Sequence, residues 1–113
     1  MANPAPIADT RADARARKRA KRAERRDKDY LRWLHTWRCL CCASYAVEAH
    51  HQPRHSQADW HDRKTLPLCA VHHRGKDGIH MLGVEGFERR WNISIEAEIA
   101  ILNAKYEEEQ GGR

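Results

Sequence analysis

The sequence predicts a small α+β domain that is stabilised by bound metal and carries a basic arm at its N-terminus. The chain has 113 residues, of which 33% are charged and only one is Phe, so its hydrophobic core is thin. Domains with so small a core usually need a metal ion or disulfides. Short extended segments alternate with helical patterns beyond residue 29. At this length we expect one domain with a tail and not a multidomain enzyme.

The sequence has no feature that directs it to a membrane. It contains no run of 18 apolar residues, and the segment from Met1 to Arg26 lacks the apolar stretch of a secretory signal peptide. We therefore expect no membrane partner and a location in the cytoplasm, where cysteines stay reduced. Four reduced Cys beside eight His favour a metal site over disulfides.

Residues 1–28 form the predicted arm. The first nine residues are expected to be disordered, and Thr10 then caps a helix through a capping box with Asp13. Between residues 11 and 28 ten basic and three acidic residues give a net charge of +7, against +5 for the whole chain. Such a block favours contact with a nucleic-acid backbone; the alternative is a solvated tail that keeps the protein soluble. The residues assigned to nucleic-acid contact, two of them from the loop over 52–63, are Arg15, Arg17, Lys18, Arg19, Lys21, Arg22, Arg25, Arg26, Arg54 and Arg63.

The domain proper is predicted over residues 29–110. At its start Tyr30, Leu34 and Trp37 fall at helical spacing, so the end of the arm helix should dock on the core. The run 45–51 is predicted as a short strand, and 65–68 as an extended segment. Between them lies a polar loop.

The second half of the domain is predicted to be helical. A helical turn is expected over 69–73, and Gly75, Gly78 and Gly83 should interrupt any longer helix there. A short helix is then predicted over 84–91, with Phe87 and Trp91 facing inward. Ser94 can cap a last helix, whose final turn should fray before Gly111 because acidic residues there oppose the helix dipole. Its apolar stripe consists of Ile95, Ile99, Leu102 and Tyr106.

Two Cys/His pairs have the spacing of a zinc site. Cys39-x2-Cys42 and Cys69-x2-His72 are separated by 26 residues, and two such tight turns can close a tetrahedron around one ion. Cys41 could compete with Cys42, but the two-residue gap favours Cys42. The alternatives are four unrelated buried thiols or a disulfide pair, which the reduced compartment disfavours.

Four further histidines lie beside these pairs. His50 and His51 end the predicted strand, so their side chains should point to opposite faces, and one could bind a metal while the other contacts a water. His73 and His80 follow the second pair. We interpret the others as surface residues that form hydrogen bonds: His35, His55 and His61.

Taken together, these motifs resemble the HNH (His-Me finger) endonucleases. The resemblance rests on Cys39-x2-Cys42, Glu48-Ala-His-His51 and Pro67-Leu-Cys-x2-His-His73. The continuation Gly78-Ile-His80-x2-Gly83-x3-Phe87 is similar to a phage and prophage branch that includes the recombination-enhancement (Ref) RecA-dependent nucleases. The resemblance implies a ββα-metal core that holds one catalytic divalent ion, here beside a structural zinc. It covers roughly residues 29–91.

The resemblance also implies a role for each residue. His51 matches the general base, whereas His50 and His73 match the ligands of the catalytic ion, Mg²⁺ or another divalent metal. His80 is a further candidate ligand of that ion. The structural zinc ligands are Cys39, Cys42, Cys69 and His72. One departure is the missing Asn that usually orients the base histidine; we expect Asp62 or a backbone carbonyl in its place.

The function expected from this resemblance is metal-dependent hydrolysis of DNA phosphodiester bonds, as an endonuclease or nickase, in phage recombination. DNA and a RecA-type recombinase filament are the expected partners, in the cytoplasm of a bacterium or of a phage-infected host. Two alternatives from other classes are a catalytically inactive zinc-stabilised module that binds nucleic acid, and an interaction protein whose acidic last helix docks on a recombinase. Strand preference, sequence specificity and oligomeric state are not encoded in any motif that we find.

Overall fold

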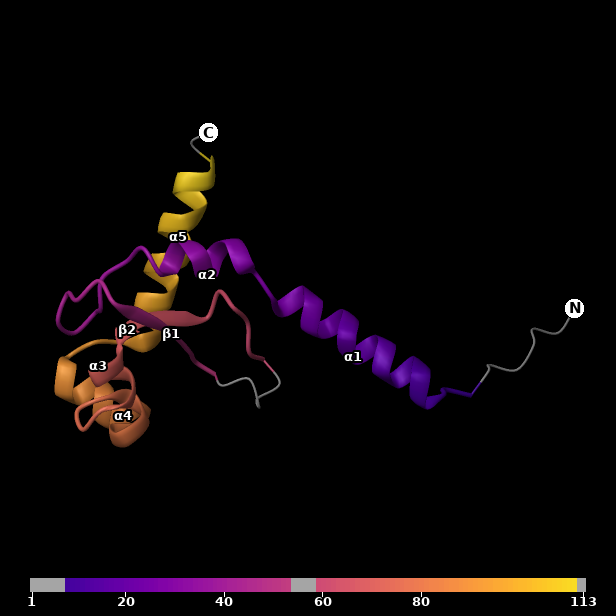
Figure 1. Ribbon diagram of the computed structural model, residues 1–113, viewed down its shortest axis with the longest axis horizontal. Helices are drawn as coiled ribbons and strands as arrows, with labels where there is room; N and C mark the ends of the chain where they lie inside the picture. The colour runs from indigo at the N-terminus through magenta and orange to yellow at the C-terminus, as the bar shows by residue number, and fades with distance from the viewer. Residues whose placement is uncertain (1–7, 54–58, 112–113) are drawn as a thin grey trace, which may run out of the picture.

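A computed structural model describes residues 8–53 and 59–111 and confirms a small α+β fold (Figure 1). Its described part has two strands, which form an antiparallel sheet in which His51 lies opposite Thr65 and Val47 opposite Cys69. The elements are α1 (Arg11–Arg25), α2 (Lys28–Leu34), β1 (Val47–His51), β2 (Thr65–Cys69), α3 (Ala70–Arg74), α4 (Ile79–Trp91) and α5 (Ile95–Gly111).

The basic arm is a helix that projects away from the rest of the molecule (Figure 1). Its predicted capping box is confirmed, since Thr10 accepts from the Asp13 N–H and the Asp13 carboxylate accepts from the Thr10 N–H. None of the residues of α1, all of which are described, is buried. This helix therefore has no core contact of its own, in agreement with its polar composition.

A continuous helix from the arm to Trp37 was the wrong expectation. The helix ends at Arg25, and Asp27 caps a new helix by accepting the Tyr30 N–H at 3.0 Å. Trp37 lies beyond the end of α2 and packs, half-buried, against the core. An Asx cap competes with the helical backbone for the same donors, which explains why the chain breaks here despite good helix formers on both sides.

The core lies between the sheet and helices α2, α4 and α5. All five residues of β2 are buried, and the strand is thus the centre of the domain. The predicted inward residue Phe87 is fully buried, whereas Trp91 is only half-buried. Further large hydrophobic residues of this core are Tyr30, Leu34, Leu66, Leu68, Ile95, Leu102 and Tyr106.

Three element boundaries differ from the prediction. The first strand begins at Val47 and not at residue 45, and the last helix continues to Gly111 without the expected fraying. Tertiary contacts hold its acidic end, because Glu107 pairs with Arg63 and Glu109 accepts a hydrogen bond from the Trp33 indole. The helix α4 begins at Ile79, before the predicted start at residue 84, although Gly83 does break it with a φ of 74°. The Ser94 side chain caps α5 as predicted. Among the described residues, no helix has the length and apolar character needed to cross a bilayer.

Two candidate metal centres and a histidine pair

The four residues with zinc-like spacing lie together in space. One turn before β1 supplies Cys39 and Cys42, and the junction of β2 with α3 supplies Cys69 and His72. Their ligand atoms all lie within 4.8 Å of one another. The Cys42 and Cys69 sulfurs are 3.6 Å apart, and His72 Nδ1 lies 3.6 Å from Cys39 Sγ and 3.2 Å from Cys69 Sγ. Tetrahedral zinc with Zn–S bonds of about 2.3 Å places sulfurs about 3.8 Å apart, so this cluster could bind a metal ion such as zinc.

The surroundings of this cluster separate Cys41 from the other thiols. The backbone N–H of Cys41 points at Cys39 Sγ at 3.4 Å. Burial alone would raise the pKa of Cys39, but the N–H groups of Cys69, Cys41 and Cys42 lower it to about 6. Burial, together with the charge on Cys39, raises the pKa of the Cys41 thiol to about 12. Cys41 is therefore a protonated thiol beside the cluster. The sulfur of Cys42 lies with the other three ligand atoms and is the fourth candidate donor, as the spacing predicts.

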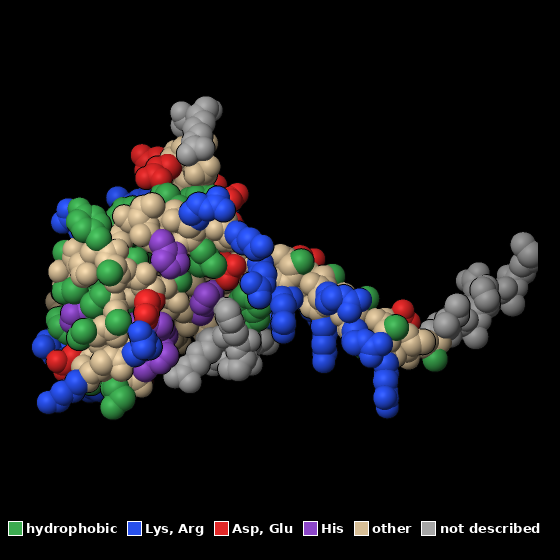
Figure 2. Space-filling model, in the orientation of Figure 1, with side chains coloured by type: hydrophobic (Ala, Val, Ile, Leu, Met, Phe, Trp, Pro, Cys, Tyr) green, Lys and Arg blue, Asp and Glu red, His purple; other side chains and the backbone are tan. Residues whose placement is uncertain are grey.

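A second cluster consists of three imidazoles. His50 on β1, His73 on α3 and His80 on α4 have ligand atoms within 4.8 Å of one another. The ring centroids of His73 and His80 are 4.5 Å apart, and that of His50 lies 5.0 Å from His73 and 5.5 Å from His80. His50 is buried, whereas His80 is exposed, so the cluster reaches the surface. In Figure 2 histidine side chains gather on one face of the body.

Neighbouring polar groups orient these rings. Glu48, on the same face of β1 as His50, accepts from His73 Nδ1 at 2.7 Å and forms two hydrogen bonds with Arg74. The Arg74 guanidinium and His73 hold the pKa of Glu48 at about 2. Gln52 Oε1 lies 3.1 Å from His50 Nε2, while burial lowers the pKa of His50 to about 4. A neutral His50 and a carboxylate-bound His73 are the forms that ligate metals.

His51 points away from the three-imidazole cluster to a buried carboxylate. Its Nε2 lies 2.9 Å from Oδ1 of Asp62, a residue only 3% exposed. The other Asp62 oxygen accepts the Asp27 N–H at 2.8 Å. With Nε2–H donated to Asp62, Nδ1 is the ring nitrogen that can accept a proton. The structure thus places Asp62 where the sequence suggested a substitute for the missing Asn.

The basic residues assigned to nucleic acid lie in different surroundings. Arg15, Lys18, Arg19 and Arg22 line one hollow on the surface of α1, and Figure 2 shows Lys and Arg side chains projecting along this helix. At its end the Arg25 guanidinium lies 5.8 Å from the Trp60 ring, which is itself 6.3 Å from His51. The arm is therefore attached beside the histidine pair.

Arg63 and Arg54 differ from the residues of the arm. The Arg63 guanidinium is bound by two carboxylates, Asp27 at 2.8 Å and Glu107, and it lies over the ring of Tyr106 at 5.0 Å. These contacts assign Arg63 a place inside the domain, and its contact with nucleic acid stays a prediction. Arg54 lies outside the described residues.

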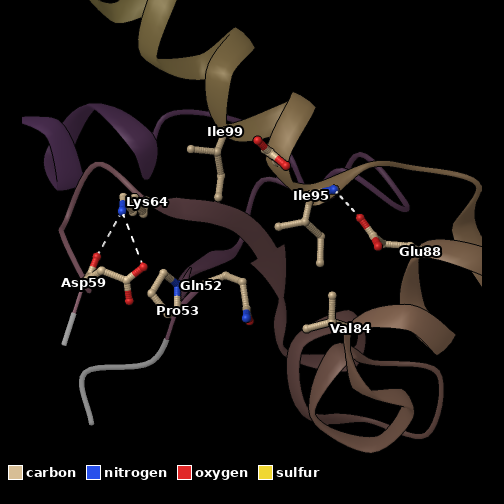
Figure 3. A pocket seen from close by; sticks show the side chains of 9 residues that line it. Gln52, Pro53, Asp59, Lys64, Val84, Glu88, Ile95 and Ile99 are labelled. Carbon is tan, nitrogen blue, oxygen red and sulfur yellow. Dashed lines mark hydrogen bonds and ion pairs between the residues drawn. The ribbon is translucent and has the colours of Figure 1, made fainter. Parts of the chain in front are cut away.

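An open groove of about 530 Å³ adjoins Gln52 and hence the three-imidazole cluster (Figure 3). Val84, Ile95 and Ile99 form its apolar wall, as Figure 3 shows. The ionisable groups among its lining residues are three carboxylates and one ammonium group: Asp59, Glu88, Glu96 and Lys64. This excess of negative charge disfavours a phosphate backbone inside the groove.

Sequence reasoning gave no role to Glu48 or Gln52. A usable signal existed for Glu48, because it lies two positions before His50 and so shares its face of β1, whereas Gln52 lies just beyond the end of that strand. The contact of Glu48 with His73, 25 residues away, depends on the packing of α3 on β1 and carries no local signal.

Comparison with known proteins identifies a family without assigning an activity. A family model described as "Protein of unknown function (DUF968)" matches residues 8–107, which is most of the chain, and the chain therefore belongs to this family. No significant match was found among curated proteins or among solved structures.

Proposed function

We propose that this member of the DUF968 family is a metal-dependent DNA endonuclease or nickase of the HNH type. The observation that supports the proposal best is that two adjacent histidines, His50 and His51, contact different groups. His51 faces the buried carboxylate of Asp62 at 2.9 Å, and the adjacent His50 belongs to a cluster of three imidazoles. A purely structural zinc module needs neither feature.

The element order also supports a ββα-metal core. The proposed base and the first proposed ligand are the last two residues of β1, and β2 leads directly into α3, which supplies His73. His80 follows at the start of α4. Under this proposal the Cys39/Cys42/Cys69/His72 cluster holds a structural zinc, which joins the turn before β1 to the end of β2.

The donor set of the three-imidazole cluster fits a divalent metal. His50 is neutral at pH 7, since burial lowers its pKa to about 4, and its Nε2 is engaged by Gln52, which leaves Nδ1 for coordination. His73 is engaged at Nδ1 by Glu48, which leaves Nε2. Imidazole ligands suit Zn²⁺, Ni²⁺ and Fe²⁺ better than Mg²⁺, so we expect a transition metal here.

When bound, such an ion neutralises charge on the scissile phosphate and on the leaving 3′ oxygen. The chain's own contribution is the proton transfer. His51 Nδ1 accepts a proton from the attacking water, while its Nε2–H stays hydrogen-bonded to Asp62. The buried carboxylate stabilises the imidazolium that forms and fixes the ring tautomer, as in other His–Asp pairs.

The charge distribution indicates where DNA lies. The helix α1, whose eight basic and two acidic residues give it a net charge of +6, is attached beside His51 through Arg25 and Trp60. The groove lined by Asp59, Glu88 and Glu96 has the opposite charge. We propose that the phosphate backbone runs from α1 over the histidine pair and avoids this groove. Contacts of this kind bind phosphates without reading sequence.

The test is cleavage of supercoiled plasmid with Mg²⁺, Mn²⁺, Zn²⁺ or Ni²⁺, with and without a RecA filament. We expect His51→Ala to lower the cleavage rate by on the order of 10²–10⁴, the usual effect of removing a general base. DNA affinity and the metal content should stay unchanged. The matched control is His35→Ala, since His35 is an exposed histidine outside both clusters.

Two results would contradict the proposal. Cleavage at the wild-type rate by His51→Ala would exclude His51 as the base. A wild-type protein that binds DNA but cleaves it with none of the metals would instead favour a zinc-stabilised nucleic-acid-binding module.

A further inference from the structure

The connection between α1 and α2 contacts the carboxylate that faces His51. Asp62 Oδ1 lies 2.9 Å from His51 Nε2, and Asp62 Oδ2 accepts the backbone N–H of Asp27 at 2.8 Å. The Asp62 N–H donates to the carbonyl oxygen of Arg25 at 2.9 Å. Both carboxylate oxygens and the backbone of Asp62 are thus engaged. One contact comes from Asp27 in the interhelical connection and one from Arg25, the last residue of α1.

A second set of contacts fixes Asp27 in turn. Its Oδ1 accepts the Tyr30 N–H at 3.0 Å, which begins α2, and its Oδ2 accepts from Arg63 Nε at 2.8 Å. Arg63 also pairs with Glu107 of α5 and lies over the rings of Tyr30 and Tyr106. The contacts of Arg63 with Asp27 and Glu107, which we call the clamp, therefore join the interhelical connection to the last helix, 80 residues further along the sequence.

We infer that Asp27 and Arg63 are positioning residues for His51, acting through Asp62. The pair holds the Asp27 N–H against one oxygen of Asp62, which directs the other oxygen at the imidazole. Because this connection directly follows α1, the same contacts attach α1 to the domain and orient His51. The inference rests on the proposed function for its catalytic consequence, but the geometry of His51 can be measured without any activity.

This inference separates two roles for Arg63. A phosphate-binding arginine would contribute to DNA affinity and to its salt dependence. A positioning arginine would contribute to the chemical step, with affinity unchanged. The two carboxylates bound to Arg63, and its side chain's exposure of only 34%, favour positioning.

The experiment compares Asp27→Asn with Asp29→Asn in the full-length protein. Asn still caps a helix but cannot accept from Arg63 as a carboxylate does. Asp29 lies two residues further along the same helix, is exposed, and pairs only weakly with Arg32 at 3.4 Å. Arg63→Gln is the second variant and opens the clamp from the other side. Circular dichroism and zinc content verify that each variant is folded.

Two readouts are needed. Nitrogen-15 NMR of the His51 ring should show a proton held on Nε2 in the wild type and in Asp29→Asn, and a mixture of tautomers in Asp27→Asn and Arg63→Gln. In the cleavage assay these two variants should lose roughly tenfold in kcat, the usual scale for outer residues that orient a functional side chain, with KM unchanged.

Unchanged His51 spectra in both folded variants would overturn the inference. So would an Arg63→Gln protein with weaker DNA binding and an unchanged kcat, since Arg63 would then contact phosphate. If the wild type cleaves no DNA, the proposed function fails, and the NMR comparison alone decides whether Asp27 and Arg63 position His51.

Discussion

The two Cys/His clusters of this domain are built from neighbouring elements but differ in chemistry. The Cys39/Cys42/Cys69/His72 cluster offers four donors, three of them thiols, and two of its cysteines belong to the hydrophobic core. The His50/His73/His80 cluster offers three imidazoles and ends at an exposed residue. Four protein donors fill a tetrahedral metal, whereas three leave a position for water or substrate. The first is suited to holding the fold and the second to chemistry.

The neighbours of the two clusters differ in the same way. Backbone N–H groups of Cys69, Cys41 and Cys42 lie around Cys39 Sγ and stabilise its thiolate. Around the imidazoles the neighbours are side chains, Glu48 and Gln52, which set ring orientation and tautomer. Backbone donors are fixed by the fold, whereas side-chain partners can be replaced one at a time, so the two clusters can be tested separately.

The largest effect is expected from loss of a thiol ligand. Structural zinc contributes about 10–16 kcal/mol in small peptides, which is comparable with the whole stability of a domain, about 5–15 kcal/mol. Cys39→Ser should therefore bind no zinc at this cluster and unfold the sheet and helices around it. Cys41→Ser is the matched control and should keep both zinc and fold. Thermal melts with metal analysis check this, and a Cys39→Ser protein with wild-type zinc content and melting temperature would contradict the assignment.

A smaller and more selective effect is expected at the imidazoles. His73→Ala should leave the fold and the thiol-bound zinc intact but abolish tight binding of a second metal. Glu48→Gln removes the carboxylate that binds both His73 and Arg74 but leaves all three imidazoles in place, and it should weaken binding of the second metal by about 10–100-fold. Raised metal concentration should restore cleavage to Glu48→Gln. Calorimetric metal titration measures both, and equal affinities in wild type and His73→Ala would exclude the second centre.

The smallest effect is expected when positive charge is removed from α1, which we propose to bind DNA beside the His50/His73/His80 cluster. Arg19→Gln combined with Arg22→Gln removes two charges from one face of α1. The dependence of log affinity on log salt concentration should then lose up to about 1.8 in slope, because each lost phosphate contact removes about 0.9. The control pair Arg89→Gln and Arg90→Gln on α4 should leave the slope unchanged. Identical slopes of log affinity against log salt concentration for all three proteins would show that the arm is a solvated tail.

Local chemistry explains which parts of this fold are predictable from the sequence. Zinc-like spacing, the Thr10 capping box and the break at Gly83 depend on residues a few positions apart, and the structure contains each of them. The break before Asp27 was not predicted, because its backbone N–H is bound by Asp62, 35 residues away. The ordered end of α5 depends on Arg63 for the same reason.

The candidate site follows the same rule. The pairing of His50 with His73 and His80 came from a resemblance that covers the whole motif, and the structure brings the three rings together. The contact of His51 with Asp62 was one of two options, since the loop between them has no periodic pattern. The contact of Glu48 with His73 could not be assigned, because His73 lies on another element. Side chains that orient other side chains across elements are the part that needs a structure.

Titration of the metal-free protein with Co²⁺ tests the difference between the two clusters most directly. Cobalt bound by thiolates absorbs strongly through sulfur-to-metal charge transfer, and cobalt bound by imidazoles does not. We expect the first equivalent to give the thiolate bands together with folding, and a second equivalent to add only weak ligand-field bands, which His73→Ala abolishes. A single equivalent bound in the wild type, or thiolate bands that grow through both equivalents, would contradict a closed structural centre beside an open three-histidine centre.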